Sequence, residues 1–182
     1  MDAGMMGWSC QRLGENSIQA DFDGTPMPTD VVSPETLYEF ADVLNERGEG
    51  FIEIINSTGG DPIRNAKRED RKVVEEIARR AGRPVLFNAV QAMDEPGAEE
   101  VHKRAIGWLT RCFEQGLQVY GQGVTVRAPF QFTLEHWNLY DSSPAWNRAT
   151  QGSTEERLAK LSDPEIRKQM IAEEDILVTS GV

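Results

Sequence analysis

Side chains that can hydrogen bond to a small molecule follow each of four short apolar runs along the chain. Most of them are amides and hydroxyls rather than charged groups; they are Ser9, Cys10, Gln11, Arg12, Asn56, Ser57, Thr58, Asn88, Gln91, Gln122 and Arg127. Amide side chains both donate and accept hydrogen bonds, so they suit the carbonyl and hydroxyl groups of a substrate. We therefore predict a small-molecule substrate that is contacted by Gln11, Arg12, Asn56, Asn88, Gln91, Gln122 and Arg127.

The two arginines of this set have two possible roles. Arg12 and Arg127 could each bind a substrate carboxylate through two parallel hydrogen bonds. They would fit salt bridges at the mouth of a barrel equally well. Both roles stay open at this point.

Histidine and cysteine, the usual ligands of zinc, are scarce. The chain has two histidines, His102 and His136, and two cysteines. His102 lies within a predicted helix beside Lys103 and Arg104, which indicates a solvated face. His136 lies in an aromatic-rich segment, where packing is the first interpretation and substrate contact the second. Cys10 has no histidine near it in the sequence to activate it as a nucleophile.

Glu53 interrupts the apolar run Phe51–Ile55. A carboxylate in a buried strand costs several kcal/mol unless it is paired. We expect either an inward salt bridge or a partly exposed strand at this position. A functional acid or metal ligand is the alternative.

Three glycines, Gly48, Gly82 and Gly116, recur at intervals of 34 residues and indicate a repeated structural unit. A stretch with the apolar periodicity of a helix precedes each glycine, and a short apolar run follows it. Glycine just past a helix adopts the left-handed conformation that ends the helix. The pattern predicts alternating helices and parallel strands, the strands being Met5–Ser9, Phe51–Ile55, Val85–Asn88 and Val119–Gln122. Because these runs are nearly all apolar, we expect both faces of the sheet to be covered.

Two architectures fit this alternation: a doubly wound sheet and part of a (β/α)8 barrel. No glycine-rich phosphate loop follows the first run, and Ser57–Asp61 lacks the dinucleotide-binding spacing. A barrel unit has about 31 residues, close to the repeat. We therefore predict an α/β fold, a partial (β/α)8 TIM barrel. Residues 1–152 would form a half-barrel and residues 153–182 a helical excursion, which begins at the capping box Ser153–Glu156.

Composition narrows the partners. The formal net charge is −11, which disfavours binding to nucleic acid and to anionic membranes. No apolar stretch approaches the length of a membrane span. Without a basic leader at Met1, the expected location is the cytoplasm, and free thiols are favoured over a disulfide.

Four segments resemble, in order and spacing, the middle of proteins of amidohydrolase family 3, the relatives of N-acyl-D-amino-acid deacylases. They are residues 7–13, 23–28, 82–88 and 157–164, and the resemblance spans roughly residues 1 to 175. It implies a barrel of the metal-dependent hydrolase type, with a divalent metal ion such as zinc as cofactor. The reaction that it implies is hydrolysis of amide-type, non-peptide C–N bonds, such as those of N-acyl amino acids. A bound metal ion would activate water and polarise the carbonyl.

The metal ligands of that family match this sequence poorly. Its amino-terminal His-x-His would precede Met1, its late catalytic Asp would follow Val182, and Asn88 occupies the position of a ligand histidine. The resemblance thus implies an internal fragment that is inactive by itself. The alternative is a non-catalytic barrel relative that binds a small ligand without metal. In keeping with a fragment, the run Ile176–Val178 resembles a strand just starting.

Overall fold

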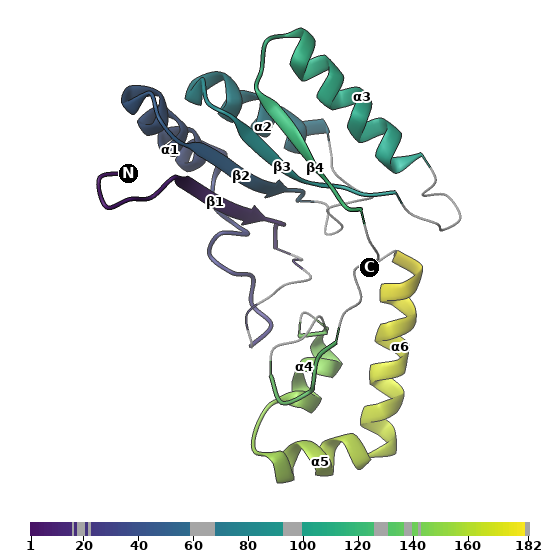
Figure 1. Ribbon diagram of the computed structural model, residues 1–182. Helices are drawn as coiled ribbons and strands as arrows, with labels where there is room; N and C mark the ends of the chain where they lie inside the picture. Colours follow the sequence, from purple (N-terminus) through teal and green to yellow (C-terminus); the bar gives the residue numbers. More distant parts are fainter. Residues whose placement is uncertain are drawn as a thin grey trace.

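A computed structural model describes the chain except for residues 16, 18–20, 22, 59–67, 93–99, 126–130, 137–139, 142 and 181–182, and except for the side chains of residues 174–180. Strands and helices alternate along its first two thirds (Figure 1). The order is β1 (Gly7–Arg12), α1 (Pro34–Arg47), β2 (Phe51–Asn56), α2 (Arg68–Ala81), β3 (Val85–Val90), α3 (Val101–Glu114) and β4 (Val119–Gly123). Three further helices follow: α4 (Pro144–Thr150), α5 (Thr154–Ser162) and α6 (Pro164–Ser180).

The four strands form one parallel sheet in the order β1-β2-β3-β4. This confirms the prediction that strands consecutive in the sequence are neighbours. The register aligns Cys10 with Ile54 and Ile54 with Phe87, so apolar side chains of three strands lie in one row. The first strand begins at Gly7 rather than at Met5 and continues to Arg12.

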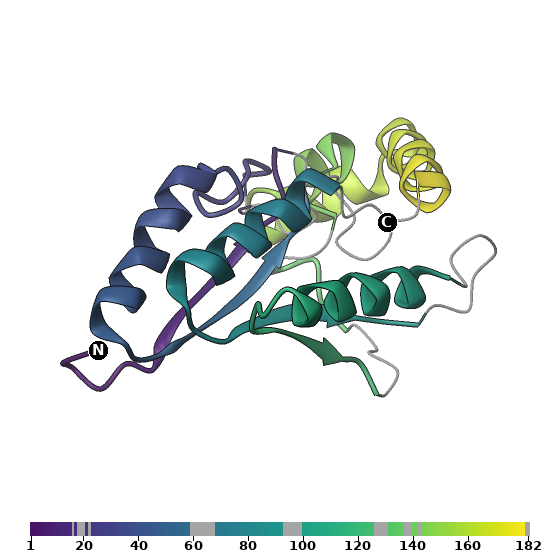
Figure 2. The same cartoon turned by 90° about the horizontal axis from the view of Figure 1, so that it is seen from above.

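All three crossover helices cover the same face of the sheet (Figure 2). Helix α1 begins with Ser33, whose hydroxyl accepts a hydrogen bond from the Thr36 amide, and it ends at Gly48 in the left-handed conformation. The side chains buried between helices and sheet form one core, which includes Leu37, Ala41, Ile52, Ile54, Val74, Ile77, Val85, Phe87, Trp108 and Val119. The apolar residues that recur with helical periodicity in the sequence therefore form the face of each helix that packs on the sheet.

The opposite face of the sheet is partly open, which corrects the expectation that both faces are covered. Phe51 is 39% exposed and Tyr120 is 54% exposed. Glu53 and Leu86 lie in the same row as Tyr120 and are half-buried. The chain is thus an α/β protein with a four-stranded parallel sheet flanked by helices, an arrangement compatible with part of an α/β barrel.

The last three helices pack on one another beyond the carboxyl ends of the strands (Figure 1). Their small core consists of Ala145, Ala149 and Met170. The predicted capping box at Ser153 and Glu156 is present and starts α5. The helices that pack together begin at Pro144, and α5 and α6 correspond to the expected excursion 153–182.

The end of α6 corrects one expectation. Ile176–Val178 belongs to this helix and is not the start of a strand. The Asp163 carboxylate accepts a hydrogen bond from the Glu165 amide and so starts the helix at Pro164. A three-residue apolar run at the end of such a helix is too short to identify a strand.

Candidate functional site

The carboxyl ends of the strands present side chains to two different faces. Because side chains alternate along a strand, Ser9 and Gln11 lie on the open face, whereas Cys10 and Arg12 lie on the helix-covered face. In β2, Glu53 lies on the open face and Asn56 on the covered one. The predicted site residues therefore do not form one cluster.

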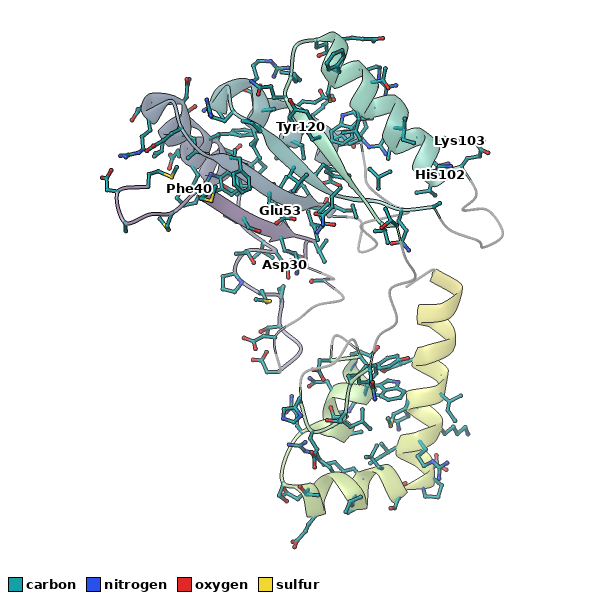
Figure 3. The ribbon with its side chains drawn as sticks, viewed as in Figure 1. Asp30, Phe40, Glu53, His102, Lys103 and Tyr120 are labelled. Carbon is teal, nitrogen blue, oxygen red and sulfur yellow. The ribbon has the colours of Figure 1, made fainter. Side chains whose placement is uncertain are left out.

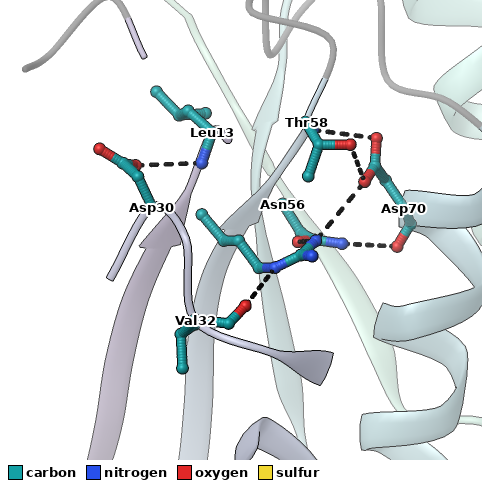
Figure 4. A network of polar contacts seen from close by, with 7 residues as sticks. Leu13, Asp30, Val32, Asn56, Thr58 and Asp70 are labelled. Atoms are coloured by element: carbon teal, nitrogen blue, oxygen red, sulfur yellow. Dashed lines mark hydrogen bonds and ion pairs between the residues drawn. The ribbon is translucent and has the colours of Figure 1, made fainter. Parts of the chain in front are cut away.

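Arg12 and Asn56 belong to a polar network on the helix side (Figure 4). The Arg12 guanidinium donates to the carbonyl oxygen of Val32 at 2.8 Å and to Asn56 Oδ1 at 3.2 Å, and its Nη1 lies 3.7 Å from Asp70 Oδ1. Asn56 Nδ2 donates to the Asp70 carbonyl oxygen at 2.7 Å. Of the two roles open to Arg12, the structure places it in a salt bridge at the strand ends.

Asp70 is the anion of this network and is 2% exposed. Besides Arg12, it accepts hydrogen bonds from the Thr58 amide at 3.0 Å and from the Thr58 hydroxyl at 2.9 Å. It lies in the first turn of α2, where a negative charge interacts favourably with the helix dipole. Sequence reasoning missed Asp70, because nothing in its local pattern distinguishes it from the exposed Glu69 beside it.

A second buried carboxylate, Asp30, lies at the end of β1 (Figures 3 and 4). Its Oδ1 accepts hydrogen bonds from the Leu13 amide at 3.0 Å and from Gln11 Nε2 at 3.2 Å. Its Oδ2 is buried and has no hydrogen-bond partner among the described residues. Gln11 is thus oriented by Asp30, a residue that the sequence analysis did not single out.

Asn88 and Gln122 are paired across β3 and β4 on the open face. Asn88 is half-buried and Gln122 is exposed. Gln91 follows β3 and is half-buried, so it too lies near the carboxyl end of the sheet. Arg127 lies outside the residues that the structure describes.

Glu53 (labelled in Figure 3) lies on the open face beside Ser9 of the neighbouring strand. The Ser9 hydroxyl donates a hydrogen bond to the Glu53 carboxylate, and the two residues are register partners. Glu53 is half-buried, which agrees with the expectation of a partly exposed strand at this position. With Gln11, Asn88 and Gln122, this pair forms a polar set that we call the open-face site.

Neither cysteine is placed or activated as a nucleophile. Cys10 and Cys112 are free and buried in the helix-side core. Burial raises the pKa of the Cys10 thiol, and the nearby Asp30 carboxylate raises it further. Burial likewise raises the pKa of Cys112 to about 11. Both thiols are therefore protonated at neutral pH.

The histidines lie apart from the open-face site. His102 lies on α3 (Figure 3) and is half-buried rather than fully solvated. His136 is exposed and lines a hollow of about 270 Å³ with Glu135, Asp141 and Arg157. Nearby, the Tyr140 ring stacks on Trp146 with centroids 4.3 Å apart, so these aromatics pack on each other.

The described residues do not fit a zinc site. Among them, no three His, Cys, Asp or Glu side chains are grouped so that they could hold a metal ion. The open-face site is mainly amide, and amide oxygens are poor zinc ligands.

Comparison of the chain with protein-family models, curated proteins and solved structures gives no match. The resemblance to amidohydrolase family 3 thus stays a prediction from the sequence. None of the described helices is long and apolar enough to cross a membrane.

Proposed function

We propose that this chain forms the substrate-binding part of a barrel-type amidohydrolase that hydrolyses amide-type, non-peptide C–N bonds, such as those of N-acyl amino acids. The observation that supports the proposal most is the open-face site. Gln11, Asn88 and Gln122 lie on the face opposite the helices, at the carboxyl ends of three parallel strands. In (β/α)8 barrels, this end of the inner face is where substrates bind.

The chemistry of the set suits an amide substrate. Amide side chains can donate to the acyl carbonyl oxygen and accept from the substrate N–H. Glu53, whose carboxylate accepts from Ser9, is the group of the open-face site that can accept a proton. Zinc belongs to the proposal through the resemblance alone, and we assign it no ligand here.

A second function is favoured by the identity of one residue. Asn88 stands where the deacylase family has a ligand histidine, and its neighbour across the sheet is the amide Gln122. An amide pair orients a polar ligand well and does not hold a catalytic metal ion. The alternative is therefore a barrel relative that binds an N-acyl amino acid or similar small molecule without hydrolysing it.

The test measures hydrolysis and binding of N-acyl-D-amino acids by this chain and by any longer protein that its genomic reading frame encodes. The amidohydrolase proposal expects turnover by the longer protein, loss of turnover on chelation, and weaker substrate binding in Asn88→Ala and Gln122→Ala. Gln118→Ala is the matched control, because Gln118 is an exposed amide before the amino end of the same strand. Binding without turnover would favour the alternative. If the longer protein neither binds nor hydrolyses these substrates, both the amidohydrolase proposal and the binding alternative are refuted.

A further inference from the structure

A cleft of about 500 Å³ lies between α2 and the carboxyl-terminal half of α3. Four cationic side chains line it: Arg68, Arg71, Lys72 and Arg111. Helical spacing explains the gathering, since positions three and four apart share one face of a helix. The chain has a net charge of −11, so this cluster of four positive side chains stands out from its mainly negative surface.

Within the described residues, these cations form no salt bridge of the kind that other arginines of α2 have. Arg79 and Arg80 both pair with Glu76 on the same helix. In the part of the chain that the structure describes, no carboxylate forms a salt bridge with any of the four cleft cations. Glu75 also lines the cleft, but its Oε1 accepts a hydrogen bond from Trp108 Nε1 at 2.8 Å.

Arg71 lies deepest among the four. Its guanidinium lies over the Trp108 ring, 5.6 Å from the centroid, and its buried Nε has no hydrogen-bond partner among the described residues. Burial lowers the pKa of Arg71, and the positive charges of Arg111 and Arg104 lower it further, while the Glu75 carboxylate offsets part of this shift. The cleft therefore contains mutually repelling cations and a donor that is not satisfied, both of which a bound anion would relieve.

We propose that this cleft binds a phosphate-bearing small molecule. A phosphate group has close to two negative charges and three strong acceptor oxygens, which match several guanidinium and ammonium donors better than one carboxylate does. The volume admits a small organic phosphate rather than a single ion. Because the cleft is lined by the helices that cover the opposite face of the sheet, it is separate from the open-face site and does not depend on the function proposed for that site.

The test is calorimetric titration of the whole chain with pyrophosphate at constant ionic strength. We expect saturable binding that weakens at least about tenfold in Arg111→Gln and in Lys72→Gln, because each change removes a charged hydrogen-bond donor. Both side chains are exposed, so these variants keep the core intact, which circular dichroism will confirm. Arg71→Gln should weaken binding in the same direction.

Lys103→Gln is the matched control. It removes one positive charge from α3, but Lys103 is exposed, pairs with Glu100 and lies outside the cleft (Figure 3). Its affinity for pyrophosphate should stay within about twofold of the wild type, as expected for a distant, screened charge. Two results would overturn the proposal: no saturable binding by the folded wild type, or equal weakening in Lys103→Gln and the cleft variants. Acetate in place of pyrophosphate should bind far more weakly, and equal affinity would show that the site does not select phosphate.

Discussion

Asp70 is the residue that joins the ends of β1 and β2 to the first turn of α2. Its side chain accepts hydrogen bonds from Thr58 and lies beside the Arg12 guanidinium, and its backbone oxygen accepts from Asn56. Each partner comes from a strand end or the loop that follows it. A buried carboxylate with this many partners positions the polar ends of two strands without itself touching a substrate.

Asp70→Asn should lower the free energy of unfolding by about 3 kcal/mol, because it leaves the Arg12 guanidinium without its buried counter-charge. Glu69→Gln is the control, since Glu69 is exposed in the same turn and should change stability by less than about 0.5 kcal/mol. Urea denaturation followed by circular dichroism measures both. Equal effects of the two substitutions would show that the network does not stabilise the fold.

The buried thiol of Cys112 predicts a pH dependence. Its pKa is about 11 in the folded chain against an ordinary 9.0, because burial disfavours the thiolate. Above pH 9 the folded state thus binds more protons than the unfolded state, so the contribution to stability is complete below pH 9 and is lost as pH rises through 11. The stability difference between wild type and Cys112→Ala should therefore shrink from pH 8 to pH 11. A difference that is constant over this range would contradict the assignment.

At the scale of elements, Gly7 decides how closely β1 can approach β2. A side-chain carbon at this position would lie 1.8 Å from the Phe51 carbonyl oxygen. Gly7→Ala should therefore separate the first strand from the second at their amino ends and destabilise the fold by several kcal/mol. Gly123→Ala in β4 is the control, because a carbon there meets nothing within 4 Å. Thermal unfolding compares the two, and equal melting temperatures would show that β1 does not need this close approach.

The elements could be predicted largely from the sequence, because their signals are local. Gly48, Gly82 and Gly116 end the helices in the left-handed conformation, and the apolar stripes face the sheet, as the spacing indicates. Consecutive parallel strands then follow from short right-handed crossovers. The limits of β1 were misplaced, because the apolar residues Met5 and Met6 precede the paired strand and are exposed.

The candidate site could be predicted only in part, since its contacts join distant segments. The rule that parallel strands present their carboxyl ends together selects Gln11, Asn88 and Gln122. It does not say that Arg12 and Asn56 point to the helix side, because a shift of one residue along a strand reverses the face. Asp30 and Asp70 accept hydrogen bonds from residues more than ten positions away in the sequence, and a local sequence pattern does not show such contacts.

At the scale of the whole molecule, the described residues leave the edges and one face of the sheet exposed. Strands β1 and β4 are the edges of the sheet, so each has one side without a neighbouring strand. On the open face, Phe51 and Tyr120 leave apolar surface in contact with water. Exposed strand edges and apolar patches both favour association with further strands.

We therefore expect the isolated chain to associate or to unfold with low cooperativity, even though its net charge of −11 favours solubility. Tyr120→Lys should increase the monomer fraction at a given concentration, because it places a charge on the open face next to the β4 edge. Light scattering coupled to gel filtration measures that fraction. Phe113→Lys is the matched control: Phe113 is 80% exposed, but it lies on α3, on the helix side. The same apolar-to-lysine change there should leave association as it is. If the wild type is monomeric at all concentrations and unfolds in one sharp transition, the open face needs no covering and the four-stranded sheet is stable as it stands.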